Sequence, residues 1–89
     1  MKRNHITYRQ LEDLLVQLGF VETSRDDKVA VFQHFAADSL IFLPGKGGDR
    51  EARTADVMSV ETHLVGWGYL EEADFEAFLE HGALPAAKR

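Results

Sequence analysis

The first predicted helix spans residues 7–18 and carries one apolar stripe. Four leucines recur three and four positions apart, which places them on one face of an α-helix: Leu11, Leu14, Leu15 and Leu18. Thr7 can cap the first turn, and Gln10 three residues later can complete a capping box. Gly19 is expected to adopt the left-handed backbone conformation and so to end the helix.

Three short stretches with the residue types of β-strands come next, at residues 20–24, 29–35 and 40–43. The second is rich in β-branched and aromatic residues, and the third is apolar on both faces. Polar turn residues separate the three stretches. Because the connections are short, we expect the strands to pair as an antiparallel meander in chain order.

Two further helices are predicted after a glycine-rich stretch at residues 44–53. Thr54 is the expected cap of the second helix, and its apolar face is formed by Val57, Met58, Val60, Leu64 and Val65. A third helix is expected over residues 71–80. Three acidic residues in its first turn suit the positive end of the helix dipole, and Gly82 is expected to end it.

Length and composition fit one small α+β domain over residues 1–84, with a frayed C-terminal tail at residues 85–89. The hydrophobic share of 45% argues against intrinsic disorder. The absence of cysteine excludes disulfides, thiol nucleophiles and cysteine-based metal sites. No apolar run approaches the roughly 20 residues of a membrane helix, and no signal-peptide core is recognised. We therefore expect a cytoplasmic protein without membrane contact.

Charge divides the chain into two parts. Residues 1–53 carry eight basic and eight acidic side chains, whereas residues 54–89 carry two basic and seven acidic ones. The formal net charge of −5 therefore lies in the last third. This segment is interpreted either as an acidic outer face of the last helices, or as a surface that repels nucleic acid or attracts a basic partner.

The order of helix, three strands and helix resembles the HicA/YcfA-like family, small toxins of bacterial toxin–antitoxin modules. The segments that carry the resemblance are TYRQLEDLLVQLGF, VETSRDDKVAVFQHF, LIFLPGKGG and RTADVMSVETHLVGWG, which together cover residues 7–66. The resemblance implies a fold similar to a double-stranded-RNA-binding domain, a three-stranded antiparallel sheet with helices on one face. Here an added C-terminal helix would extend that fold.

The family's chemical signature is a Gly-Ser-His that precedes the aromatic residue of the second strand. Aligning that aromatic residue with Phe32 places the three signature positions on Asp27, Lys28 and Val29. The resemblance implies that the histidine activates a ribose 2′-hydroxyl in metal-independent RNA cleavage, and valine cannot exchange a proton. We therefore expect a non-catalytic relative. The only residue available as a relocated base is His34, which points to the opposite face of the strand.

Alternation along the second strand predicts an apolar open face of the sheet. If Phe32 faces the helices, then Val29, Val31 and Phe35 lie on the other side. Soluble monomers rarely expose such a face. We expect the segment at residues 67–84 to cover it as a lid, with a second copy of the chain, on this face or along an edge strand, as the alternative. The candidate partner or lid residues are Val29, Val31, Phe35, Trp67, Tyr69, Phe75 and Phe78.

The glycine-rich stretch at residues 44–53 is the strongest local indication of a binding site. Glycines let backbone amides turn inward, and the following helix start favours anions. The candidate RNA- or anion-binding residues are Lys28, Lys46, Arg50 and Arg53. The spacing does not match a Walker motif, and Asp49 and Glu51 dilute the charge. RNA contact is therefore expected to be weak and salt-sensitive, and a plain surface loop is the alternative.

Taken together, these patterns predict a small non-catalytic interaction or regulatory domain that acts through protein contact or self-association. One alternative is a weak RNA-binding domain that uses the glycine-rich basic loop. Another is a HicA-like mRNA interferase with a relocated base. No cofactor is expected, and no metal site is expected because the four histidines lack metal-ligand spacing.

Overall fold

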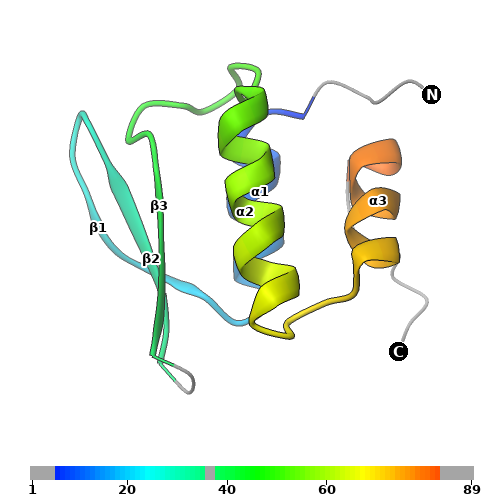
Figure 1. The fold of residues 1–89 in the computed structure, drawn as a ribbon. Coiled ribbons are helices and arrows are strands. Elements are labelled where there is room, and N and C mark those ends of the chain that lie inside the picture. Colours follow the sequence, from blue (N-terminus) through cyan, green and yellow to red (C-terminus); the bar gives the residue numbers. More distant parts are fainter. Residues whose placement is uncertain (1–5, 36–37, 83–89) are drawn as a thin grey trace.

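The computed structural model describes residues 6–35 and 38–82 (Figure 1). The elements in chain order are α1 (Tyr8–Gln17), β1 (Val21–Arg25), β2 (Ala30–His34), β3 (Ser39–Leu43), α2 (Thr54–Gly66) and α3 (Glu72–His81). This order confirms the predicted α+β pattern of a helix, three strands and two helices. The tail predicted at residues 85–89 lies outside the described residues.

The start of α1 is held by the predicted capping box. The Gln10 amide donates to the Thr7 hydroxyl at 3.2 Å, and the Gln10 side-chain oxygen accepts from the Thr7 amide at 2.9 Å. Gly19 has φ of 101°, so it ends the helix in the left-handed region as predicted. The inward leucines of the stripe are buried, namely Leu11, Leu14 and Leu15.

The three strands form an antiparallel sheet in the order β1-β2-β3, which confirms the meander. One face of this sheet packs into the core through Ala30 and Phe32 of β2 and Ile41 and Leu43 of β3. A shift in register between Glu22 and Ser24 forms a bulge in β1. Bulges disrupt the pairing of an edge strand and twist it, which makes β1 a poor template for a further strand.

α3 lies on the side of α1 and α2 away from the sheet (Figure 1). Its residues Phe75, Phe78 and Leu79 belong to the same buried cluster as the core residues of α1 and the sheet. The expected lid over the open sheet face is therefore wrong. Phe75 and Phe78 are core residues and not part of a partner or lid surface.

The length of the connection explains why α3 stays on the helix side. Five residues, 67–71, separate the end of α2 from the start of α3. A stretch of this length spans at most about 17 Å. Reaching the open sheet face would require passing a helix and a sheet that are each about 10 Å thick.

The ends of α2 and α3 follow the sequence pattern only in part. The N-cap of α2 is Arg53, with no side-chain cap hydrogen bond, so the expected capping by Thr54 is wrong. Met58 was expected on the apolar face of α2 but is 54% exposed, because the buried stripe runs through Val57, Val60 and Leu64. Gly82 ends α3 with φ of 76°, as predicted.

Replacing Phe75 by alanine tests the position of α3 in the core. The ring is fully buried, so Phe75→Ala should lower the free energy of unfolding by about 3–5 kcal/mol, through lost apolar burial and the cavity left behind. Urea denaturation followed by circular dichroism measures this loss. The exposed neighbour supplies the control, since Glu76→Ala should change stability by less than about 0.5 kcal/mol. A loss of under about 1 kcal/mol for Phe75→Ala would contradict the packing of α3.

Candidate functional site

The side of the sheet that faces away from the helices is apolar and exposed. Val31 pairs with Phe42, and Gln33 pairs with Leu40, at positions that alternate with the buried residues of β2 and β3. The exposed fractions are 50% for Val21, 64% for Phe35, 45% for Leu40 and 59% for Phe42. We define the open face as Val21, Ser24, Val31, Gln33, Phe35, Leu40 and Phe42.

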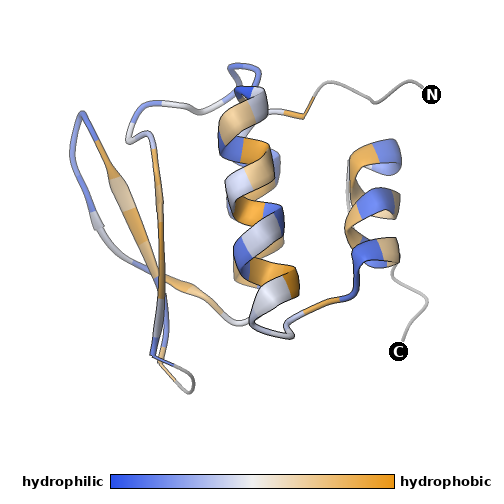
Figure 2. Ribbon diagram, viewed as in Figure 1, coloured by the Kyte–Doolittle hydropathy of each residue, from blue (hydrophilic) through white to orange (hydrophobic). Residues whose placement is uncertain are grey.

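The three predicted partner residues of the second strand lie on β2 or directly beside it. Val31 lies on the open face, and Phe35 follows the end of β2 with its ring exposed. Val29 is half-buried just before β2, where its amide donates to the Asp26 carboxylate at 2.9 Å and helps close the hairpin. Figure 2 shows β2 and β3 coloured largely as hydrophobic.

Sequence reasoning recognised the third strand as apolar on both faces, but it did not assign residues of β1 or β3 to the open face. Val21, Leu40 and Phe42 were not singled out as site residues. The signal was available in the unbroken apolar run at residues 40–43, because a strand that is apolar at every position must present hydrophobic side chains on both faces of a sheet. The residues of the open face come from three separate strands, so no single stretch of sequence shows them together.

Trp67 and Tyr69 lie away from the open face, at the end of α2. The Trp67 ring is 5.0 Å from the ring of His63 on α2. The Tyr69 ring packs against Phe20 at 5.1 Å, and its hydroxyl donates to the Ser39 hydroxyl at 3.2 Å. These two residues therefore do not join Val31 and Phe35 in one surface, as the sequence prediction supposed.

His34 lies on the helix-facing side of β2 and is half-buried. Its ring centroid is 5.2 Å from that of Phe20 and 4.8 Å from that of Tyr69. Its Nδ1 atom is buried and has no hydrogen-bond partner among the described residues. Gly19 leaves room for this ring, since a Cβ there would lie 2.8 Å from Nε2. His34 therefore packs between aromatic rings at the edge of the core.

The glycine-rich loop folds over the N-terminal end of α1. The Gly48 carbonyl accepts from the Arg9 amide at 2.8 Å, and the Arg50 carbonyl accepts from the Tyr8 amide at 3.0 Å. These are amides that the first turn of a helix otherwise leaves without partners. The loop therefore closes the end of α1 that would attract an anion.

Two glycines of this loop allow close packing of its backbone. A Cβ on Gly47 would lie 2.5 Å from the Tyr8 side chain, and a Cβ on Gly45 would lie 1.8 Å from the Asp26 carbonyl oxygen. No side chain fits at such distances. These glycines are explained by contacts with α1 and the β1–β2 turn, without any ligand.

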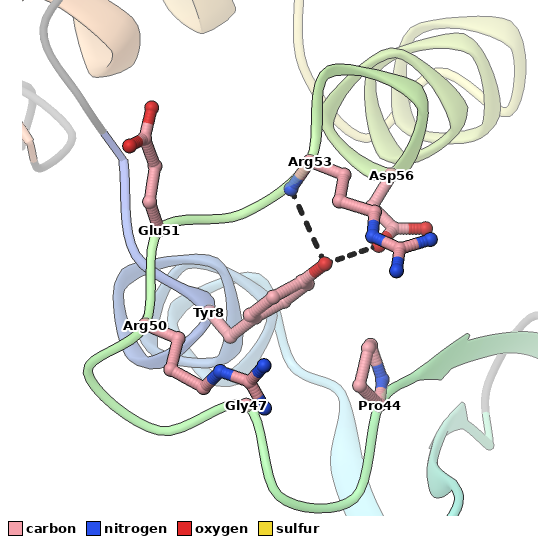
Figure 3. A pocket seen from close by; sticks show the side chains of 7 residues that line it. All are labelled: Tyr8, Pro44, Gly47, Arg50, Glu51, Arg53 and Asp56. Atoms are coloured by element: carbon pink, nitrogen blue, oxygen red, sulfur yellow. Dashed lines mark hydrogen bonds between the residues drawn. The ribbon is translucent and has the colours of Figure 1, made fainter.

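The structure brings together two of the four predicted basic residues. Arg50 and Arg53 line a pocket of about 320 Å³ with Tyr8, Pro44, Gly47, Glu51 and Asp56 (Figure 3). Lys46 instead lies 3.5 Å from the Asp27 carboxylate. Lys28 belongs to the turn between β1 and β2 and does not line this pocket.

The Tyr8 hydroxyl connects the two helices at the centre of this pocket. It donates to the Asp56 carboxylate at 2.5 Å and accepts from the Arg53 amide at 3.2 Å (Figure 3). Burial of the phenol and its hydrogen bond to Asp56 raise the pKa of Tyr8. Tyr8 and Asp56 are 48 positions apart, so no local pattern could have paired them.

The charges around the pocket nearly balance. The pocket lining includes two guanidinium groups, of Arg50 and Arg53, and two carboxylates, of Glu51 and Asp56. Figure 3 shows the Glu51 carboxylate directed away from the Tyr8 ring, whereas the Asp56 carboxylate is held by the Tyr8 hydroxyl. The pocket can accept a small anion beside the start of α2, but its charge gives such binding little strength.

Two other kinds of site have no counterpart in the part of the chain that the structure describes. At residues 6–35 and 38–82, no group of three or more histidine, aspartate or glutamate side chains is placed to hold a metal ion. None of the helices described is both long enough and apolar enough to cross a membrane.

No protein-family model, no curated protein and no solved structure matches the chain.

Removing the Tyr8 hydroxyl tests the link between α1 and α2. Tyr8→Phe should lower the free energy of unfolding by about 1–2 kcal/mol at pH 8, because it leaves the Asp56 carboxylate without its donor. The pKa of the folded phenol lies above its ordinary value of 10.0, so folding favours the protonated form. This contribution is complete below about pH 10 and is lost as the pH rises through the folded pKa.

Urea denaturation of both proteins between pH 8 and 11 measures this effect. The stability difference between the wild-type protein and Tyr8→Phe should shrink above about pH 10. An equal, non-zero difference at both ends of the pH range would contradict the raised pKa of Tyr8 in the folded protein. A difference near zero throughout would show that the hydroxyl adds nothing and that Tyr8 contributes by packing alone, because phenylalanine keeps the ring.

Proposed function

We propose that this chain is a non-catalytic interaction domain whose working surface is the open face. The observation that carries the proposal is the exposure of Phe35 and Phe42, at 64% and 59%, on a sheet face that no element of the described chain covers. We also propose that the chain is related to HicA-like toxins and shares a fold like that of double-stranded-RNA-binding domains. We further propose that the protein is cytoplasmic.

The size of the open face supports an interaction surface. A free aromatic side chain presents about 150–250 Å², so Phe35 and Phe42 each expose on the order of 100 Å². With Val21, Val31 and Leu40, the apolar part of the face reaches roughly 300–400 Å². This is the size of the largest apolar patch on a typical monomer, and such a patch is often functional. Single exposed residues such as Val16 on α1 need no such explanation.

The chemistry at the position of the family signature supports the non-catalytic part. Val29 has no group that can accept the proton of a ribose hydroxyl. The preceding residues serve the turn, since the Asp26 carboxylate accepts from the amides of Lys28 and Val29. These bonds hold the pKa of the Asp26 carboxyl below its ordinary value. Residues 26–29 therefore form the turn of the β1–β2 hairpin, and this role explains their hydrogen bonds.

Site-specific photocrosslinking in cells tests the proposed surface. A photoreactive phenylalanine analogue at Phe35 or Phe42 should form protein crosslinks, because partner atoms would lie against these rings. The same analogue at Val16 or Met58, which are similarly exposed but lie on α1 and α2, should form far fewer. Equal yields at all four positions would remove the open face as a specific contact surface.

A second candidate function is weak RNA binding at the pocket lined by Arg50 and Arg53. Two guanidinium groups beside the start of a helix favour a phosphate. The two carboxylates of this pocket and the acidic α3 oppose it.

Filter binding with a short RNA at 50 and 200 mM salt tests this candidate. The double variant Arg50→Gln with Arg53→Gln should weaken binding about tenfold at low salt, whereas Arg9→Gln, outside the pocket lining, should not. No retention of RNA at 50 mM salt would reject the candidate.

A further inference from the structure

We propose that the occupant of the open face is a second copy of this chain, packed sheet to sheet about a two-fold axis. This inference rests on the proposed function and names the partner for the same surface. In the assembly, the two sheets form the inner layers and the helices of each copy form the outer layers. Packed sheets lie about 10 Å apart, which leaves room for the rings of Phe35 and Phe42 to interdigitate.

The charge of the open face permits self-contact. A two-fold axis brings the same surface of both copies together, so any charge on that surface would meet a like charge. The open face contains five apolar residues with Ser24 and Gln33, and no charged residue. Self-contact therefore neither buries a charge nor opposes two like charges.

The acidic part of the chain lies far from this surface. α3 carries Glu72, Asp74, Glu76 and Glu80 and lies beyond α1 and α2 as seen from the sheet (Figure 1). Sheet-to-sheet contact would place the two α3 helices at opposite ends of the assembly. The carboxylates of α3 in the two copies are then separated by far more than the roughly 8–10 Å screening length at physiological salt.

The area of the face suits a small dimer interface. The smallest specific interfaces bury about 500 Å² on each partner. The apolar side chains of the open face supply most of that area, and Ser24, Gln33 and the edges of the strands can supply the rest. An interface of this size predicts a dimer that dissociates on dilution.

Pairing along a strand edge covers the face less completely. β3 is the edge without a bulge, so it is the edge available for a further strand. Pairing there would bring Leu40 and Phe42 of two copies together but would leave Val21, on the opposite edge strand, in water. Sheet-to-sheet contact covers all of these side chains at once.

Sedimentation velocity over about 1–300 µM protein tests the inference. The wild-type protein should shift from monomer to dimer over this range. Phe42→Lys should weaken the dimer at least tenfold, because it places like charges opposite each other. Met58→Lys is the matched control, with 54% exposure on α2 against 59% for Phe42, and should leave dimerisation unchanged. Phe35→Ser, which adds no charge, should weaken the dimer in the same direction as Phe42→Lys.

Hydrogen exchange of the amides in β3 distinguishes the two dimer geometries. Sheet-to-sheet contact should leave exchange at the outer edge of β3 nearly independent of protein concentration, whereas edge pairing should protect these amides as the dimer forms. Protection there would overturn the sheet-to-sheet arrangement.

The remaining outcomes separate this inference from the function on which it rests. A wild-type protein that stays monomeric up to 300 µM would overturn the second copy as occupant. If photocrosslinks at Phe35 and Phe42 then join the chain to a different protein, the open face remains an interaction surface. If those positions give no specific crosslinks at all, the proposed function fails as well. A dimer that Phe42→Lys and Met58→Lys weaken equally would place the contact elsewhere.

Discussion

All three helices enter one apolar core from the same side of the sheet. The buried rings Phe32 of β2 and Phe75 and Phe78 of α3 belong to a single cluster, joined through the leucines of α1. A chain of 89 residues has too little apolar material for a second core. Because α3 is used on the helix side, nothing in the described chain remains to cover the other side of β2 and β3. The open face is exposed because the apolar residues of α3 are already buried on the helix side of the sheet.

The glycine-rich loop shows how one segment can serve packing where its composition resembles a ligand site. Its carbonyl groups accept hydrogen bonds from amides at the start of α1, and Gly47 allows the loop backbone to lie against the Tyr8 ring. The Tyr8 hydroxyl donates to Asp56 and accepts from the Arg53 amide, so it links the N-terminal ends of α1 and α2. Two of the glycines that suggested an anion site, Gly45 and Gly47, are explained by close contacts within the chain. The guanidinium groups of Arg50 and Arg53 remain as the features of this region that suit a phosphate.

The two ends of the molecule differ in their chemistry. The open face presents uncharged side chains, with phenylalanine and leucine exposed, and the α3 side presents carboxylates. Such a separation keeps self-repulsion away from an apolar contact surface and favours association in one orientation. It also opposes RNA on the α3 side, because phosphates would meet glutamates there.

Local patterns were enough to place every helix and strand of the described chain to within a few residues. The leucine spacing and the Thr7–Gln10 capping box depend on neighbours three or four positions apart, which is the range that a helix imposes. The alternation of β2 placed Phe32 and Val31 on opposite faces of the sheet, and the structure shows that Phe32 is the residue in the core. The destination of α3 and the pairing of Tyr8 with Asp56 depended on packing between distant segments. Apolar periodicity shows that a face will be buried, but it does not show which other surface will bury it.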